Sequence, residues 1–293
     1  MHKAGFVSII GKPNVGKSTL LNSLLGQHLS IVTHKAQTTR HRIKGIYNDE
    51  NHQVVFSDTP GMIEPNYLMQ EKMMGFVSAS LEDADLVLFI REAGETQIHA
   101  ESLEKLKALT VPLIVVINKA DLSTQEIIQK QSEWLKENLK PLAVIPISAL
   151  KKFNTEALLD LIKETIPESP PYFEKDELSD LNERFFVSEM VREQIFIHYK
   201  QEIPYSSEVS VDSFAEKNGI THISATIYVE RDSQKAILIG KMGEGIKRVG
   251  TESRKQIQKF LGKKVHLVLF VKVEKDWRKD ENLLKRFGYI LNQ

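Results

Sequence analysis

Residues 11–18, GKPNVGKS, decide the fold of the N-terminal part of this 293-residue chain. They follow an apolar run, Phe6–Ile10, and precede a helix-like segment, so they stand where a strand turns into a helix. Glycines at Gly11 and Gly16 leave room for an anion against backbone N–H groups, and the following helix adds its positive N-terminal end. The stretch also matches the pattern G-x-x-x-x-G-K-[ST], in which lysine contacts nucleotide phosphates and the hydroxyl contacts Mg²⁺. The residues predicted to form this phosphate site are Gly11, Lys12, Pro13, Asn14, Val15, Gly16, Lys17, Ser18 and Thr19.

The composition indicates folded domains with one basic region. Apolar residues make up 41% of the chain, which is enough for packed cores. The formal net charge is zero, but residues 235–293 contain 15 Lys+Arg against 6 Asp+Glu, a local charge of +9. Such a segment favours a localised site for a polyanion. The chain has no cysteine, which excludes disulfides, thiolate nucleophiles and zinc–thiolate sites. With no signal peptide and no long apolar segment, we expect a soluble, cytoplasmic protein.

Residues 1–168 alternate short apolar runs with amphipathic segments, which predicts an α/β domain whose mostly parallel sheet carries helices on both faces. Two runs separated by Asn48–His52 predict a hairpin and hence one antiparallel edge. The predicted strands are 6–10, 44–48, 53–57, 85–90, 112–117 and 142–146. The predicted helices are 17–26, 68–82, 97–109, 124–139 and 154–166.

A proline-rich stretch, PESPPYF at 167–173, interrupts both periodicities and predicts a linker over 169–179. A second domain is expected over 180–275, followed by a tail over 276–293. Its predicted order is helix 180–200, strands 207–216 and 221–230, helices 233–239 and 244–261, and strand 264–274. This α-β-β-α-α-β order predicts an α+β domain whose three-stranded sheet is covered by helices on one face.

Two further motifs follow strands of the first domain. Asp58-Thr59-Pro60-Gly61 comes directly after strand 53–57, where a carboxylate can hold Mg²⁺ through a water beside the phosphates. Asn118-Lys119-Ala120-Asp121 comes directly after strand 112–117, at the edge where ligands of open α/β sheets bind. Each could alone be an ordinary turn. Together with the phosphate stretch, in order, they indicate one nucleotide site.

Asp121 predicts which base binds there. A carboxylate accepts two hydrogen bonds, which matches N1–H and the exocyclic amine of guanine, whereas adenine offers neither donor. A site left with an unpaired carboxylate can reject the wrong base by a factor of about 10⁴. Lys119 is expected to lie along the base, and the loop Ser148-Ala149-Leu150 to brace the site. The sequence therefore predicts a guanine nucleotide.

The stretches GKPNVGKS, DTPG, NKAD and SAL together resemble the base- and phosphate-binding motifs of translation-factor-class small GTPases. The polar segment 27–43, with Gln37-Thr38-Thr39-Arg40, is similar to the first switch of that class, and 59–75 would be the second. The resemblance implies Ser18, Thr39 and, through water, Asp58 as Mg²⁺ ligands, with Thr38 as the alternative to Thr39. Lys17, Thr39 and Gly61 would act in catalysis.

One catalytic side chain of many GTPases is missing. Where a glutamine often follows DxxG and orients the attacking water, this chain has Met62, whose thioether cannot align a water well. The chain resembles the hydrophobic-substituted branch of the class, in which an asparagine at the position of Asn14 helps some members to hold K⁺. We expect slow intrinsic hydrolysis that K⁺ or a partner accelerates. Asn14 serving only to shape the loop is the alternative.

The second domain contains a G-x-x-G stretch, Gly240-Lys241-Met242-Gly243, between two predicted helices. A turn poor in side chains lets a nucleic-acid backbone approach closely, and Lys247 and Arg248 follow on the next helix. With the element order and the local charge, the domain resembles a type II K homology domain, which clamps about four single-stranded nucleotides. The alternative is a plain helix–helix turn beside a solvated basic helix.

The whole chain resembles the bacterial Era family, with Arg91-Glu92 standing where relatives carry an Asp-containing turn. The resemblance implies a monomeric ribosome-assembly factor that binds single-stranded rRNA near the 3′ end of small-subunit rRNA. It also implies the small ribosomal subunit as partner and peripheral contact with the inner face of the cell membrane.

Two other functions remain open. The chain could be an RNA-binding module with a structural, non-hydrolysing nucleotide site, or a GTPase whose second domain binds protein or membrane. Trp277 and Tyr289 could stack on bases, although anchoring the tail on the core is the favoured interpretation. The nine histidines show no metal-ligand spacing, and His34 and His41 in the first switch are expected to be solvated.

Overall fold

The computed structural model describes residues 1–95, 98 and 100–290. Contacts divide the chain into two compact units. The first unit comprises Met1–Ser30, Thr39–Glu64 and Met73–Asp180, and the second comprises Ile31–Thr38, Pro65–Lys72 and Leu181–Gln293. No helix in the described part of the chain is both long and apolar enough to cross a membrane.

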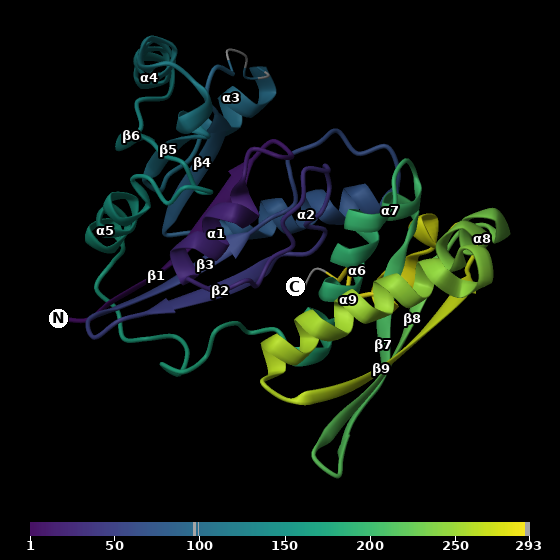
Figure 1. The fold of residues 1–293 in the computed structure, drawn as a ribbon. Coiled ribbons are helices and arrows are strands. Elements are labelled where there is room, and N and C mark those ends of the chain that lie inside the picture. The colour runs from purple at the N-terminus through teal and green to yellow at the C-terminus, as the bar shows by residue number, and fades with distance from the viewer. Residues whose placement is uncertain (96–97, 99, 291–293) are drawn as a thin grey trace. The chain divides into compact units, whose positions relative to one another are not determined.

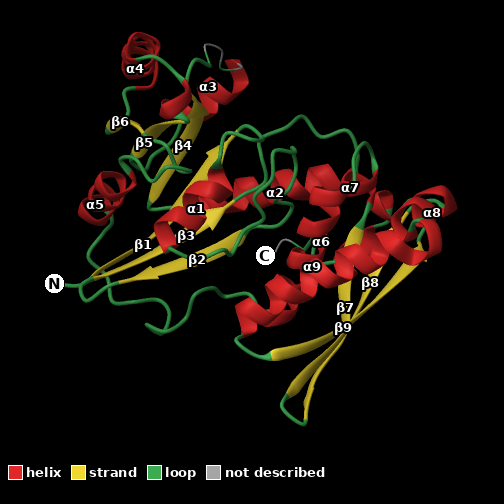
Figure 2. Cartoon of the chain, viewed as in Figure 1, coloured by secondary structure: helices red, strands yellow, loops and turns green. Residues whose placement is uncertain are grey.

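The first unit contains a six-stranded sheet in the order β2-β3-β1-β4-β5-β6 (Figures 1 and 2). The strands are β1 (Lys3–Gly11), β2 (Ile43–Asn48), β3 (His52–Asp58), β4 (Leu86–Glu92), β5 (Leu113–Asn118) and β6 (Ala143–Pro146). All neighbours are parallel except β2 and β3, which form the predicted antiparallel hairpin. The carboxyl ends of the parallel strands β1, β3, β4, β5 and β6 therefore meet at one edge, and the predicted nucleotide motifs follow β1, β3, β5 and β6.

Helices cover both faces of this sheet. They are α1 (Lys17–Leu25), α2 (Leu68–Glu82), α3 (Ala100–Lys107), α4 (Gln125–Leu139) and α5 (Thr155–Thr165). Of α2, residues 73–82 belong to the first unit and residues 68–72 to the second. Leu20 of α1 and Leu158 of α5 pack in one apolar cluster, whereas Leu106 of α3 and Leu135 of α4 pack in another. The predicted fold class is confirmed. Residues 97 and 99 of the predicted helix 97–109 lie outside the described residues.

The second unit has the predicted α-β-β-α-α-β order with one added helical turn. Its elements are α6 (Glu183–His198), α7 (Ile203–Ser206), β7 (Glu208–Lys217), β8 (Ile220–Val229), α8 (Asp232–Ile239), α9 (Glu244–Leu261) and β9 (Lys264–Val273). The sheet order is β7-β8-β9, with β7 antiparallel and β9 parallel to β8. Val191 of α6, Leu238 of α8 and Val249 of α9 share one cluster with the inward side chains of the sheet. Figure 2 shows α8 and α9 on the same side of the strands.

The tail after β9 packs into the second unit. Trp277 is fully buried, and its Nε1–H donates to the carbonyl of Ser206 at 3.0 Å. Tyr289 is also buried, and its hydroxyl donates to Glu208 Oε2 at 2.6 Å. A short helix, α10 (Glu281–Arg286), lies between them. Both rings therefore anchor the tail, and neither is available to stack on a base.

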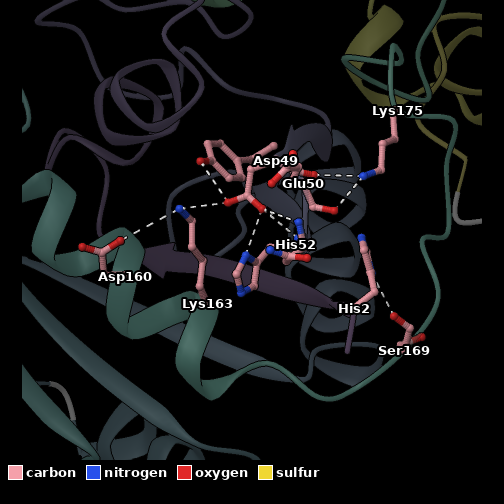
Figure 3. A network of polar contacts seen from close by, with 10 residues as sticks. His2, Asp49, Glu50, His52, Asp160, Lys163, Ser169 and Lys175 are labelled. Atoms are coloured by element: carbon pink, nitrogen blue, oxygen red, sulfur yellow. Dashed lines mark hydrogen bonds and ion pairs between the residues drawn. The ribbon is translucent and has the colours of Figure 1, made fainter.

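Residues 169–179, whose composition predicts a linker, pack on the first unit. Figure 3 shows one of these contacts, in which Lys175 Nζ donates to two backbone carbonyls of the β2–β3 turn. The backbone N–H of Ile46 in β2 donates to the carbonyl of Leu178 at 2.9 Å, and the contacts of the first unit extend to Asp180. Proline-rich composition shows where regular structure ends, but it does not show which surface the segment packs against.

Replacing Trp277 by alanine should destabilise the second unit by about 3–5 kcal/mol, because a large buried ring and its hydrogen bond are lost. Chemical denaturation followed by circular dichroism measures the change. The other tryptophan, Trp134, is 37% exposed on α4, so Trp134→Ala is a matched control with an expected loss of about 1 kcal/mol or less. Unchanged stability of Trp277→Ala would contradict the anchoring role.

Candidate nucleotide and RNA sites

The phosphate loop joins β1 to α1 and is locked to the base motif. Gly16 has φ +97°, and a Cβ at Gly16 would lie 2.2 Å from Asn118 Nδ2. The same Nδ2 donates to the carbonyl of Val15 at 2.7 Å, and Asn118 Oδ1 accepts from the N–H of Ala149 at 3.0 Å. One buried asparagine therefore ties three motifs together. Glycine is required at Gly16 because the amide of Asn118 fills the space of a side chain.

The other loop residues differ in exposure. Asn14 is exposed and has φ +65°, a left-handed conformation that asparagine tolerates better than most residues. Lys12 is partly exposed and forms an ion pair with Glu95. Val15 is buried in the core, and Thr19 lies in the first turn of α1.

Lys17 is almost fully buried at the start of α1. Its Nζ donates to the carbonyls of Gly11 at 3.2 Å and Lys12 at 2.9 Å. Burial lowers the pKa of Lys17 to about 8, and the nearby charge of Asp58 only partly opposes this. An anionic ligand beside Lys17 would stabilise its charge, so the loop favours phosphate.

Three oxygen side chains converge beside Lys17. Ser18 Oγ donates to Asp58 Oδ2 at 2.6 Å, Thr39 Oγ1 lies 3.3 Å from the same oxygen, and the two hydroxyls are 2.9 Å apart. Burial raises the pKa of Asp58, although the hydrogen bond from Ser18 counteracts it. Within the described residues, Asp58 Oδ1 is buried without a hydrogen-bond partner. Hard oxygen ligands around a buried carboxylate fit Mg²⁺.

Thr39 is thus the threonine of the first switch whose hydroxyl reaches this cluster. The neighbouring Thr38 belongs to the second unit and offers its carbonyl to Arg192 of α6. Of the first switch, residues 31–38 therefore belong to the second unit, and residues 27–30 and 39–43 belong to the first.

The stretch 58–61 packs directly on the phosphate loop. Thr59 Oγ1 donates to the carbonyl of Ile9 at 2.7 Å, and Pro60 is buried. A Cβ at Gly61 would lie 2.7 Å from the backbone nitrogen of Pro13, so only glycine fits. Met62 donates its N–H to the carbonyl of Gly11 at 3.0 Å, while its side chain packs against an apolar cluster. Met62 therefore has a packing role and presents no polar group.

The base motif leaves its carboxylate accessible. Asp121 is exposed in a short 3₁₀ turn, Ala120–Leu122, which follows β5. Lys119 has φ +61°, and its Nζ donates to Glu92 Oε2 at 2.6 Å. Ser148 is buried and accepts at Oγ from the N–H of Lys151, whereas Leu150 is 75% exposed.

No motif predicts the roles of Glu92 and Glu95. Glu92 holds Lys119, while Glu95 pairs with Lys12 of the phosphate loop and with the buried Arg91. The sequence carries one usable signal, because residue 92 ends the strand next to the strand that ends at Asn118. A charged residue at that position must lie beside the base motif.

The G-x-x-G stretch forms an exposed loop between α8 and α9. Gly240, Met242 and Gly243 all have positive φ, and Met242 is 94% exposed. Lys241 in the loop and Lys247 and Arg248 in the first turns of α9 are exposed. All six predicted RNA contacts therefore lie on one loop and one helix start.

Part of the first switch contacts the helix that supports this loop, within the second unit. Lys35 Nζ donates to the carbonyls of Phe196 and Tyr199 at the end of α6. Tyr199 in turn donates its hydroxyl at 2.6 Å to the carbonyl of Leu238, two residues before Gly240. No sequence pattern predicts the contacts of Lys35 and Arg192, since they depend on tertiary packing.

Replacing Lys17 by methionine should stabilise the nucleotide-free protein and abolish phosphate binding. The pKa of Lys17 falls from 10.5 in the unfolded chain to about 8 in the folded chain, so the buried charge costs about 3 kcal/mol below pH 8. The cost fades as the pH rises from 8 to 10.5. Denaturation without nucleotide should therefore show a stability gain at pH 7 that shrinks toward pH 10.

A matched control for this variant is Lys130→Met on α4, where the lysine side chain is 73% exposed. Its stability should stay within about 0.5 kcal/mol of the wild type. A gain for Lys17→Met that is equal at pH 7 and pH 10 would contradict the cost of the buried charge.

Two family models match the chain. The model described as 50S ribosome-binding GTPase matches residues 6–119, and the KH domain model matches residues 202–278. GTPase Era of Geobacter metallireducens is 43% identical over 291 residues, covering 98% of both chains. GTPase Era of Geotalea daltonii is 44% identical, covering 98% of this chain and 97% of the relative.

Solved structures agree over the full length. Era in complex with MgGDPNP and nucleotides 1506–1542 of 16S ribosomal RNA has a TM-score of 0.95 at 38% identity, covering 99% of this chain and 100% of that chain. A variant of Aquifex aeolicus Era bound to GDP·AlF₄⁻ has a TM-score of 0.94 at 37% identity, with the same coverage. With these relatives matching from end to end, the chain belongs to the Era family of GTPases.

Proposed function

We propose that this chain is a GTP-hydrolysing switch that binds single-stranded rRNA through its K homology domain and acts in assembly of the small ribosomal subunit. The observation that carries the proposal is the full-length similarity to an Era bound to both MgGDPNP and 16S rRNA. A phosphate loop, a guanine motif and a G-x-x-G loop in one chain support it. GTP or GDP with Mg²⁺ is the expected ligand pair.

We assign the roles of the nucleotide-site residues from their chemistry. Ser18, Thr39 and, through a water, Asp58 would hold Mg²⁺, which neutralises charge on the phosphates. Lys17 and the backbone of Gly61 would contact the transferring phosphate. Asp121 would accept from guanine, held in place by the Asn118 bridge. Because Met62 cannot orient water, hydrolysis needs help from K⁺ or from a partner.

We propose that the first switch couples the two sites. Thr39 lies at the Mg²⁺ cluster, while Lys35 and Thr38 contact α6, which supports the G-x-x-G loop. Ordering of Thr39 by GTP·Mg²⁺ would then change how the preceding segment lies on α6. Linkage requires RNA to change GTP affinity by the same factor. Equal RNA affinity with GTP analogue and with GDP would contradict the coupling.

Two alternatives have clear tests. A structural, non-hydrolysing nucleotide site predicts no GTP turnover, whereas the proposal predicts turnover that disappears in Lys17→Met. A second domain that binds protein or membrane predicts no RNA affinity. Cytoplasmic location, a monomeric state and peripheral contact with the inner face of the cell membrane remain part of the proposal.

Changing Lys241 and Met242 together to aspartate should lower affinity for a 16S rRNA 3′-end fragment by about tenfold or more, because the loop would repel the RNA backbone. Fluorescence anisotropy at fixed salt measures this. The matched control changes Lys217 and Asn218, at the β7–β8 turn, to aspartate, which alters the charge of the same unit equally. Equal losses in the two variants would show general electrostatic attraction only.

Replacing Asn14 by glycine tests the K⁺ site without straining the loop, since glycine adopts φ +65° freely. We expect the wild type to hydrolyse GTP faster in K⁺ than in Na⁺, and the variant to lose that difference while retaining GDP affinity. Single-turnover hydrolysis in matched buffers measures both rates. A K⁺ preference that survives in Asn14→Gly would leave the residue with a loop-shaping role only.

A further inference from the structure

Residues 92–95, here called the clamp turn, lie beside the base motif in the first unit. Glu92 ends β4 and is paired in register with Asn118 at the end of β5. The N–H of Ala93, the next residue, donates to the carbonyl of Asn118 at 2.9 Å. The sheet therefore places the clamp turn next to the asparagine that joins the phosphate loop to the base motif.

A buried glutamine of α4 fixes the shape of the clamp turn. Gln131 Oε1 accepts from the N–H of Gly94 at 2.9 Å. Its Nε2 donates to the carbonyls of Glu92 at 3.0 Å and Glu95 at 3.1 Å. The N–H of Glu95 also donates to the carbonyl of Glu92 at 3.1 Å. Because one side chain binds three backbone groups of the turn, the carboxylates at its two ends start from a fixed backbone.

Glu92 holds the lysine of the base motif. Lys119 Nζ donates to Glu92 Oε2 at 2.6 Å, and both side chains are partly exposed. Lys119 has φ +61°, a left-handed conformation that is disfavoured for lysine. An ion pair at this exposure adds little to the stability of the fold. It does, however, keep a long and flexible side chain in one place before a nucleotide binds.

Glu95 holds the phosphate loop in the same way. Its carboxylate forms an ion pair with Lys12 Nζ, and the buried Arg91 donates to its carbonyl from Nη2 at 3.0 Å. The carbonyl of Lys12 in turn accepts from Lys17 Nζ at 2.9 Å. Lys12 is therefore held through its side chain and through its backbone, next to the lysine that is expected to contact phosphate.

The charges of the clamp turn allow two opposite expectations. A carboxylate near a polyphosphate site repels the ligand and neutralises a lysine that would attract it. Long-range electrostatics therefore predicts that removal of Glu92 or Glu95 strengthens nucleotide binding. Positioning predicts weaker binding, because a lysine that is not held must lose its freedom when the nucleotide binds. The sign of the change thus separates the two effects.

We propose that the clamp turn is a positioning element of the nucleotide site, in which Glu92 acts through Lys119 on the base motif and Glu95 acts through Lys12 on the phosphate loop. It ties together the same two motifs as the Asn118 bridge, with ion pairs in place of an amide. Each glutamate acts through another residue and is therefore a positioning residue. The proposal rests on the roles of the nucleotide-site residues proposed above.

Alanine and glutamine replacements of each glutamate separate positioning from charge. Both replacements remove the charge, but glutamine keeps an oxygen that accepts from the lysine. We expect Glu92→Ala and Glu95→Ala to weaken GDP binding by at least about fivefold. Glu92→Gln and Glu95→Gln should bind GDP within about twofold of the wild type. Titration of the full-length proteins with fluorescently labelled GDP and Mg²⁺ measures these affinities.

Double variants show whether each glutamate acts through its lysine. Lys119→Met should weaken GDP binding, and adding Glu92→Ala to it should change the affinity by less than about twofold. Adding Glu95→Ala to Lys12→Met should likewise have less than about a twofold effect. A glutamate that only stabilises the fold of the turn would cause the same loss with and without its lysine.

The matched control is Glu104→Ala on α3. Glu104 pairs with Lys107 at 3.1 Å, and neither residue belongs to a nucleotide motif, so GDP binding should stay within about twofold of the wild type. An equal loss in this control would overturn the proposal, because any lost carboxylate would then have the same effect.

Three other results would also overturn the clamp turn. They are tighter GDP binding by the alanine variants, equal effects of alanine and glutamine, and a full Glu92→Ala loss in the Lys119→Met background. A wild type that binds no GDP would refute the proposed nucleotide site and the clamp turn together. GDP binding by the wild type with unchanged binding by the alanine variants would refute the clamp turn alone.

Discussion

The bridge made by the Asn118 side chain is the constraint on which the nucleotide site depends. Its amide fills the space beside Gly16, holds the backbone of Val15 and receives the N–H of Ala149. These contacts join loops that follow three different strands. A ligand contacted by all three loops meets groups whose relative positions are already fixed, so little ordering entropy is lost on binding.

Buried charge is the second determinant of the site. Lys17 and Asp58 are both shielded from water, and burial moves the pKa of each toward its neutral form. A bound phosphate would favour the charged form of Lys17, and a bound divalent cation would favour the charged form of Asp58, because each supplies the opposite charge. The same two residues that weaken the empty protein therefore stabilise the loaded one, as expected for a site selected for binding and not for stability.

Sequence alone predicts the parts of this protein that depend on local pattern. The strand and helix order, the motif loops and the antiparallel β2 follow from periodicity and from turns. The path of residues 167–180 along the first unit does not, because Gln53 is one buried polar residue inside an ordinary strand pattern and its partners Tyr172 and Phe173 lie 119 and 120 positions away. The roles of Glu92 and Lys35 cannot be predicted from the sequence for the same reason: they depend on a neighbour that only the folded chain supplies. The role of Trp277 can be predicted only in part. An aromatic residue in a tail can either pack on the core or stack on a base, and only its burial decides between the two.

The contacts of residues 167–180 with β2 also concern the edges of the sheet. An open sheet has two edges whose unpaired backbone groups can recruit strands from other molecules. Here Leu178 occupies a donor of β2, while the opposite edge strand, β6, has only four residues and ends at Pro146. Proline offers no N–H to a docking strand. Moving residues 167–180 away from β2 would thus leave the N–H of Ile46 at this edge without its partner.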